Sequence, residues 1–183
     1  MDKILRPGIL FLTFLIAVLT IQTVTSNKIH ALEKNSLSYS KDVVTIRERE
    51  RQLDCLAKNI YFEAATEPFE GKVAVAQVTM NRAESGRFPS DICAVVYQKN
   101  IIMEKVVCQF SWYCENAGSK KVIRYREQYD ESYAVAKKVL LEGFRLDIMK
   151  DALYYHADYV NPKWGKEKIG KIGAHIFYRE SKS

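Results

Sequence analysis

The apolar positions of this chain recur with helical spacing in several separate stretches. The first stretch reads VVTIRERERQLDCLAKNIYFEA, and its charged RERER block is expected on the solvated face of a helix. The candidate inward positions are Val44, Leu53, Leu56, Ala57 and Ile60. The stretch therefore predicts an amphipathic helix that packs one face against a core.

Two more long helices are predicted further along the chain. Residues 71–84 are apolar around much of the helix surface, so this helix should be heavily buried. Asn81 and Arg82, near its end, are expected to hold the neighbouring loop. Residues 128–142 form another periodic stretch, and Gly143 is well placed to end it.

The remaining segments predict shorter elements. Ser90 or Asp91 can cap a brief helix that follows the Arg-Phe-Pro break. Near the end of the chain, ALYYHADYV and IGAHIFY are rich in β-branched and aromatic residues, and the loop between them contains Pro and Gly. Such a pair predicts a two-stranded hairpin. The pattern as a whole predicts an α+β fold that is mostly helical, with a small antiparallel sheet.

The first 26 residues have the pattern of an export signal. Lys3 and Arg6 precede an apolar run from Gly8 to Val24, which is slightly short for a membrane span of about 20 residues. We expect either a cleaved signal peptide or an uncleaved signal anchor. Residues 27–42 are polar and unpatterned, which is typical of a linker, and residues 43–183 are expected to form one domain.

Composition narrows the possible partners. Of the 183 residues, 48% are hydrophobic, which is enough for one domain with a sizeable core. The net charge of +6 suits an acidic polymer, whether nucleic acid, anionic lipid or cell wall. Lys120, Lys121, Arg124 and Arg126 form a basic cluster, but an export signal argues against nucleic acid. We therefore expect no nucleic-acid partner, and membrane contact only through the N-terminal segment.

Glu63 is the candidate acid/base of the chain. It lies three residues after Ile60 and seven after Leu56, so its carboxylate would sit beside the inward face of the first helix. Burial and the negative end of the helix dipole would both raise its pKa. A carboxyl group that stays protonated near neutral pH can act as a general acid. The alternative is a solvated charge that merely ends an amphipathic helix.

Six motifs, in one order, resemble the SleB-type cell wall hydrolases, which are spore-cortex-lytic enzymes and their relatives in bacteria and phages. The motifs are CLAKNIYFEA, EGKVAVAQVTMNR, SGRFPSDICAVVYQ, CQFSWYC, YYHADYVNPKW and IGAHIFYR. The resemblance implies a lysozyme-like catalytic domain that cuts peptidoglycan glycan strands, usually as a lytic transglycosylase, with Glu63 as its acid/base. The chain departs from many relatives at Ala65-Thr66, where they carry Arg-Gly, and this puts the local loop shape in doubt.

In such an enzyme, Glu63 would protonate the glycosidic oxygen between N-acetylmuramic acid and N-acetylglucosamine. The C6 hydroxyl of the muramic acid itself would be the nucleophile. Hydrolysis by a muramidase or glucosaminidase would usually need a second carboxylate, for which Asp151 and Asp158 are the candidates. Because the chain departs from many relatives at Ala65-Thr66, a non-catalytic glycan-binding protein with the same fold is an alternative. We expect no metal, no organic cofactor and a monomer.

Four cysteines after an export signal favour disulfides, with three possible pairings. We expect Cys108 to pair with Cys114, closing the QFSWY loop, and Cys55 to pair with Cys93, tying the catalytic helix to the brief helix. Buried free thiols are one alternative. A papain-like wall amidase is another, with Cys55 or Cys108 as nucleophile and His156 as base. A metal site is not expected, since the chain has no CxxC pair and the HxD sequence at His156 lacks a third ligand.

Aromatic and polar side chains in the motifs are candidate sugar contacts. The CH faces of sugars pack on aromatic rings, while their hydroxyls need fixed polar partners. The candidates are Tyr61, Gln109, Phe110, Ser111, Trp112, His156 and Tyr178. The alternative is that the aromatic residues belong to the core and the histidine is structural.

Overall fold

The structure is a computed structural model that describes residues 2–42, 46–115 and 121–181. Two positions named above, Val44 and Lys120, lie outside the described residues. The chain divides into two units, Met1–Ile46 and Arg47–Ser183, which are described separately.

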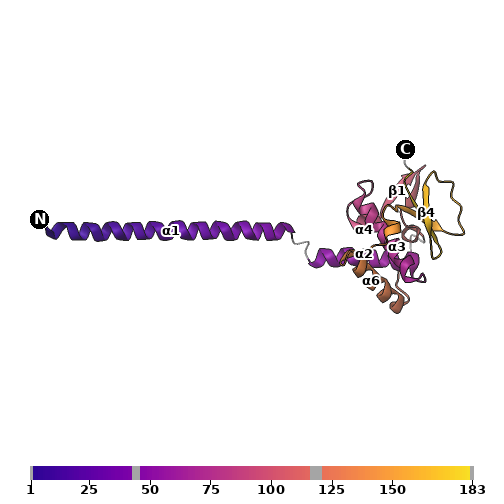
Figure 1. The fold of residues 1–183 in the computed structure, drawn as a ribbon, viewed down its shortest axis with the longest axis horizontal. Helices are drawn as coiled ribbons and strands as arrows, with labels where there is room; N and C mark the ends of the chain where they lie inside the picture. The colour runs from indigo at the N-terminus through magenta and orange to yellow at the C-terminus, as the bar shows by residue number, and fades with distance from the viewer. Residues whose placement is uncertain (1, 43–45, 116–120, 182–183) are drawn as a thin grey trace. The chain divides into compact units, whose positions relative to one another are not determined.

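The first unit is one long helix, α1 (Asp2–Asp42), drawn in indigo to violet in Figure 1. Within the described part of the chain, Phe11–His30 is a helical stretch of 20 residues that is long and apolar enough to cross a membrane. A signal sequence near an N-terminus has the same character. The helix continues through residues 27–42, and the assignment of this segment as a linker stays a prediction, as does that of residues 1–26 as a signal.

The second unit contains the helices predicted from periodicity, together with two short ones. They are α2 (Ile46–Ala64), α3 (Phe69–Glu84), α4 (Ile92–Val96), α5 (Ser111–Cys114), α6 (Arg126–Leu140) and the 3-10 helix η1 (Asp147–Met149). As predicted, the carboxylate of Asp91 caps α4 by accepting from the Ala94 N–H at 2.7 Å. Gly143 follows α6 with a φ of 71°, a left-handed conformation that glycine adopts without strain.

Helix α3 is heavily buried, as its apolar circumference predicts. Val73, Val75 and Val78 are fully buried on it. The main core includes Leu56 and Ile60 of α2, so the two helices share one apolar interior with α4 and α6. Figure 1 shows α2, α3 and α6 close together. The end of α2, where Glu63 lies, is thereby held against a rigid core.

The strands form two antiparallel sheets. A hairpin pairs β1 (Lys99–Ile102) with β2 (Lys105–Cys108), and a three-stranded sheet has the order β3-β5-β4. The latter consists of β3 (Tyr154–Ala157), β4 (Glu167–Ile172) and β5 (His175–Arg179).

The predicted terminal hairpin is correct in pairing β3 with β5 but omits β4. Strand β4 reads EKIGKI, and its lysines and glycine interrupt the run of apolar and β-branched residues that would predict a strand. The pairing of β4 with β5 is also irregular, with a register shift between Lys168 and Gly170. The β1–β2 hairpin was not predicted either. Its turn residues Met103 and Glu104 have positive φ, where glycine or asparagine is usual, so the sequence carries no turn signal.

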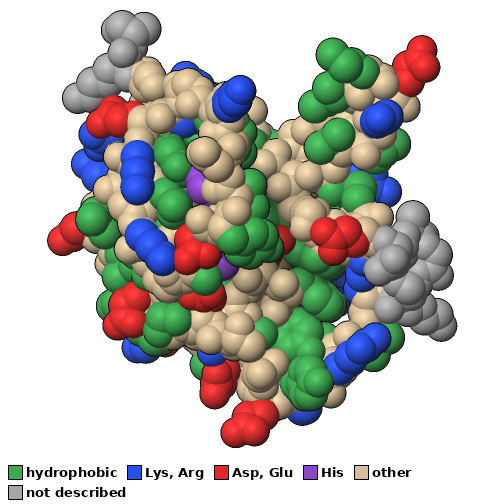
Figure 2. Space-filling model, turned by 90° about the vertical axis from the view of Figure 1, so that its right-hand side faces the viewer, with side chains coloured by type: hydrophobic (Ala, Val, Ile, Leu, Met, Phe, Trp, Pro, Cys, Tyr) green, Lys and Arg blue, Asp and Glu red, His purple; other side chains and the backbone are tan. Residues whose placement is uncertain are grey.

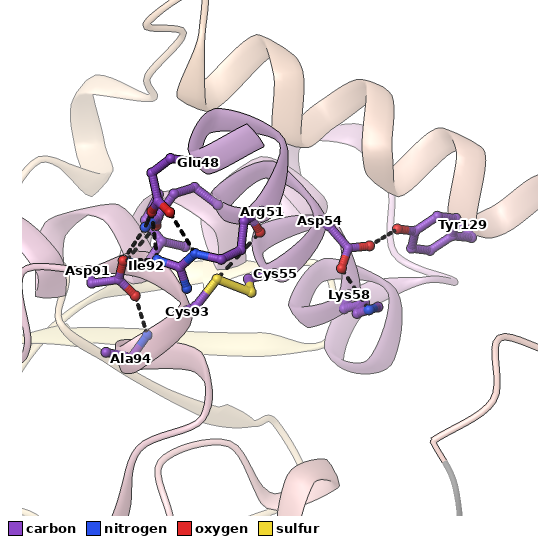
Figure 3. Close-up of a disulfide and its surroundings, with 11 residues drawn as sticks. Glu48, Arg51, Asp54, Cys55, Lys58, Asp91, Ile92, Cys93, Ala94 and Tyr129 are labelled. Atoms are coloured by element: carbon purple, nitrogen blue, oxygen red, sulfur yellow. Dashed lines mark hydrogen bonds and ion pairs between the residues drawn. A yellow bond between two sulfur atoms is a disulfide. The ribbon is translucent and has the colours of Figure 1, made fainter. Parts of the chain in front are cut away.

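Both predicted disulfides are present. Cys55 of α2 pairs with Cys93 of α4, and Cys108 at the end of β2 pairs with Cys114 of α5. Figure 3 shows the first of them beside Arg51, which forms ion pairs with Glu48 and with Asp91. Disulfides and an apolar N-terminal helix together indicate an exported protein.

Candidate active site

A cavity of about 380 Å³ lies where the end of α2 meets β3, β5 and the segment around α5. The face shown in Figure 2 is hollowed, and apolar, acidic and histidine side chains meet in and beside the hollow. The cavity is lined by Phe62, Glu63, Arg82, Gln109, Phe110, Ser111, Trp112, Glu115, Tyr155, His156, Ala157, Tyr159 and His175. These residues come from stretches far apart in the sequence, so the cavity exists only in the folded chain.

Glu63 lies in the last turn of α2 and lines this cavity. Its position follows from the helical period, because Ile60 and Leu56 on the same side of the helix are fully buried. The Tyr155 hydroxyl, 92 residues away in the sequence, lies 2.9 Å from its Oε2 atom and donates to it.

The surroundings of Glu63 favour its protonated form. Burial raises the pKa of the Glu63 carboxyl, and the nearby Glu115 carboxylate acts in the same direction. The hydrogen bond from Tyr155 and the positive charge of Arg82 oppose this shift without reversing it. The structure therefore contains a carboxyl group with a raised pKa at the surface of a cavity, which is the arrangement that general acid catalysis needs.

Tyr155 is a hydrogen-bond donor that sequence reasoning missed. Burial raises the pKa of its hydroxyl well above the usual value, and the Glu63 carboxylate acts in the same direction. The hydroxyl therefore keeps its proton at physiological pH. The ring packs edge-on against His175, with ring centres 5.1 Å apart, and this contact fixes its direction. No local pattern links Tyr155 to Glu63, since one lies on a strand and the other on a helix.

Arg82 is a buried positive charge in the cavity wall, with only 4% of its surface exposed. Its Nε donates to the carbonyl of Leu153 at 2.8 Å, and its guanidinium lies over the rings of Phe88 and Phe110. The hydrogen-bond partners assign the orientation of the Gln109 amide, with its oxygen facing Arg82. In this orientation the oxygen accepts from both terminal nitrogens of the Arg82 guanidinium, at 3.2 Å each. Arg82 was expected only to hold a loop, and its place beside Glu63 was missed.

Asn81 and Arg82 also hold a segment that is distant in the sequence. The Asn81 amide donates to the carbonyls of Met149 and Ala152, each at 2.9 Å. Together with the Arg82–Leu153 bond, these contacts hold the segment that leads into β3. Arg82 also lies over Phe88 in the loop that follows α3, as expected. The contact with a segment about seventy residues further along the chain was not expected.

Five of the seven predicted sugar contacts line the cavity, namely Gln109, Phe110, Ser111, Trp112 and His156. Phe110 and Trp112 are only 2% and 7% exposed, so most of each ring belongs to the core. Trp112 stacks on Phe62 with ring centres 4.4 Å apart, and its Nε1 donates to Asn59. Ser111 is exposed and free to meet a ligand from solvent.

The other two predicted contacts, Tyr61 and Tyr178, do not line this cavity. The Tyr178 hydroxyl lies 2.9 Å from His156 Nε2, and the two rings stack. His156 Nδ1 lies 2.8 Å from the Ala157 carbonyl oxygen, which can only accept, so this geometry assigns the tautomer with a proton on Nδ1 and an Nε2 that accepts from Tyr178. Tyr178 therefore positions His156, while Tyr61 points its hydroxyl at a different segment.

The two candidate partner carboxylates lie elsewhere. Asp158 forms an ion pair with Lys171 at 2.7 Å, and neither it nor Asp151 lines the cavity. The second carboxylate that does line it is Glu115, which follows α5. Sequence reasoning missed Glu115 because it stands outside the motifs that carry the resemblance.

The cysteine-dependent alternative is wrong. All four cysteines are joined in disulfides, so neither Cys55 nor Cys108 offers a thiol. Cys55 is also 5% exposed and ties α2 to α4. A nucleophilic thiolate requires a free, accessible sulfur, which this arrangement does not provide.

Comparison with known proteins gives concordant matches. A profile of the family described as Cell Wall Hydrolase matches residues 66–178, a range that begins three residues after Glu63. A spore cortex-lytic enzyme of Bacillus subtilis is 29% identical over 130 residues, which are 67% of this chain and 35% of that protein. One of Bacillus cereus is 29% identical over 132 residues, 70% of this chain and 44% of that protein. The chain thus spans less than half the length of these relatives.

Two solved structures share the fold. The catalytic domain of the Bacillus cereus SleB protein has a TM-score of 0.52 and 24% identity, covering 71% of this chain and 91% of that one. The catalytic domain of the germination-specific lytic transglycosylase SleB from Bacillus anthracis has a TM-score of 0.52 and 26% identity, covering 70% and 93%. The predicted fold, a lysozyme-like and mostly helical α+β domain with small antiparallel sheets, is confirmed.

Proposed function

The chain belongs to the cell wall hydrolase family, and on this premise we propose that it is an enzyme that cleaves the glycan strands of peptidoglycan. Two observations support this activity: its relatives are spore cortex-lytic enzymes, and a relative of the same fold is described as a lytic transglycosylase. The observation that carries the proposal within this chain is the raised pKa of Glu63 at the cavity surface. We propose Glu63 as the acid/base of a lytic transglycosylase.

The first step of this reaction is protonation of the leaving oxygen. Because Oε2 of Glu63 accepts from Tyr155, the transferable proton is carried by Oε1. Glu63 gives this proton to the glycosidic oxygen as the bond from C1 of N-acetylmuramic acid to that oxygen breaks. The resulting Glu63 carboxylate is stabilised by the Tyr155 hydrogen bond and by the charge of Arg82, which both favour its ionised form.

The second step returns the proton. The C6 hydroxyl of the same muramic acid attacks C1, and its proton passes to the Glu63 carboxylate, which restores the acid. The product is a 1,6-anhydro end. An intramolecular hydroxyl is favoured over water because it is already held next to the reacting carbon. We expect His156, Gln109 and Ser111 to contact the sugar from the cavity wall.

Hydrolysis is the second candidate, and Glu115 is the observation that favours it. This residue is a second carboxylate in the lining of the same cavity. In a hydrolytic muramidase or glucosaminidase, it would activate a water molecule or stabilise the charge at C1. The products distinguish the two routes, because a 1,6-anhydro end is lighter by one water molecule than a reducing end.

We propose that the enzyme acts outside the cytoplasm, in the periplasm or cell wall, as a monomer. The apolar helix α1 and the disulfides support export. If the N-terminal segment is not cleaved, its apolar stretch would anchor the protein to the membrane. Peptidoglycan lies outside the cytoplasmic membrane, so an exported enzyme would meet its substrate in that compartment.

The test is the substitution Glu63→Gln, which keeps the size of the side chain but removes the transferable proton. Activity on purified cell walls should fall by about 10² to 10⁴-fold, as expected for a lost general acid. Glu70→Gln is a matched control, since Glu70 is exposed on α3 and outside the cavity. Mass spectrometry of the wild-type digest should find 1,6-anhydro ends. Full activity in Glu63→Gln would refute the assignment, and reducing ends alone would replace transglycosylation with hydrolysis.

A further inference from the structure

A second cavity borders the first. It has a volume of about 570 Å³, and Phe62, the residue before Glu63, lines both cavities. Lys121 lines the second cavity and donates from Nζ to the backbone carbonyl of Glu115, which lines the first. The two cavities are therefore neighbours, and a polymer bound at Glu63 can extend from one into the other.

The two cavities differ in charge. The first contains the carboxyl groups of Glu63 and Glu115 beside the buried Arg82. Among the described residues, the lining of the second contains Lys121 and Arg124 and no acidic side chain. Neither cation forms an ion pair with a carboxylate among residues 2–42, 46–115 and 121–181. The second cavity thus presents two positive charges that no carboxylate of the described residues neutralises.

Tyr61 fixes the wall that carries these charges. Its hydroxyl accepts from the backbone N–H groups of Arg124 and Tyr125, each at 3.1 Å. Tyr61 is 8% exposed and lies two residues before Glu63 on α2. The turn of helix that positions the candidate acid therefore also positions Arg124. The backbone that carries Arg124 is thus held in place before a ligand arrives, which lowers the cost of ordering this wall on binding.

We propose that the second cavity binds a carboxylate carried by the muramic acid next to the scissile bond. This inference rests on the proposed function, because it assigns a subsite of the same glycan. N-acetylmuramic acid carries a lactyl group whose carboxyl is either free or linked to a peptide stem, and the stem bears carboxylates of its own. Lys121 and Arg124 would pair with this carboxylate, while Phe62 and Val122 provide apolar contact.

The experiment compares a double variant with a matched control. Lys121→Gln/Arg124→Gln removes both charges of the second cavity, and the Tyr61 hydrogen bonds remain because they involve the backbone. Arg126→Gln/Lys137→Gln removes the same charge from exposed positions of α6 that line neither cavity. Thermal unfolding of both should match the wild type, since all four side chains lie at least partly in solvent.

Three substrates identify the group that is bound. They are glycan strands with peptide stems, strands freed of stems with a free lactyl carboxyl, and stem-free strands in which this carboxyl has been converted to a neutral amide. The double variant should lose about 10-fold in kcat/KM on a carboxylate-bearing substrate, as expected for lost charge-assisted hydrogen bonds, and nothing on the amide. A loss that persists on stem-free acid strands identifies the lactyl carboxylate. A loss confined to stem-bearing strands identifies the stem.

Binding to soluble glycan fragments separates this inference from the proposed function. In a Glu63→Gln background, the double variant should bind carboxylate-bearing fragments about 10-fold more weakly than the control, with a smaller difference at high salt. If the wild type cleaves no glycan but this difference is found, the proposed function fails and the subsite stands. Equal cleavage and equal binding by the double variant and its control would overturn the subsite and leave the proposed function intact.

Discussion

Replacing Tyr155 with phenylalanine isolates the hydrogen bond that acts on the candidate acid. The substitution removes the hydroxyl that donates to Oε2 of Glu63 at 2.9 Å. The ring is retained, together with its edge-on contact with His175. Because the hydrogen bond favours the charged form of Glu63 and opposes the effect of burial, its loss should raise the pKa of Glu63 further.

The expected shift can be bounded. A hydrogen bond to a charged group contributes about 1.5 to 3 kcal/mol, and one pKa unit corresponds to about 1.4 kcal/mol. Complete loss of the Tyr155 hydrogen bond would therefore raise the pKa of Glu63 by about 1 to 2. A general acid must carry its proton, so activity is lost as the pH rises through the pKa of Glu63. The basic limb of the pH profile in Tyr155→Phe should move upward by about 1 pH unit. The rate at the optimum should fall about 10-fold, because the carboxylate formed during the reaction loses a donor.

The assay is kcat/KM on soluble glycan strands, measured as a function of pH for the wild type and the variant. Tyr133→Phe is the control, because Tyr133 lies on α6 outside the cavity and its variant loses the same hydroxyl. A variant that merely disturbed the fold would lose activity at every pH without moving the limb. A basic limb that stays in place or moves to lower pH would refute the reasoning.

Two further predictions concern stability. Reduction of the disulfides Cys55–Cys93 and Cys108–Cys114 should lower the free energy of unfolding by at least about 2 to 4 kcal/mol, measured by denaturation with and without reductant, and an unchanged midpoint would contradict it. For Glu63, the folded pKa is raised above the usual 4.5, so the folded state binds more protons and stability should fall as the pH rises from about 4.5 to the folded pKa. Thermal scans of Glu63→Gln should lack this decline, and an identical slope in both proteins would count against the raised pKa.

Local patterns in the sequence determined the helices α2, α3, α4 and α6 and the position of Glu63 on α2. The inward positions Leu56 and Ile60 follow the helical period, and both are fully buried. Asp91 caps its helix because its side chain reaches the third following N–H, which is a contact within one turn. Such features depend on neighbours a few residues away, so a single sequence contains the information that fixes them.

The disulfides could also be predicted, although their ends are further apart. Pairing Cys108 with Cys114 needs only a short closed loop. Pairing Cys55 with Cys93 was expected to tie the helix of Glu63 to the brief helix α4, in an exported chain with an even number of cysteines. By contrast, β1, β2 and β4 were missed, since their strands are short and carry lysines and their turns or bulges lack the usual residues.

Only the tertiary structure decided which residues surround Glu63. Tyr155 is 92 residues away along the chain, and its hydroxyl reaches Oε2 because β3 packs across the end of α2. Arg82 enters the cavity wall because the last turn of α3 is held to the segment before β3. Tyr61 belongs to the same motif as Glu63 but faces the second cavity, since neighbouring residues on a helix point in different directions. Helical periodicity is a property of adjacent residues, whereas a cavity is formed by the packing of distant ones. The sequence therefore determined where the candidate acid lies on its helix, and the fold determined its surroundings.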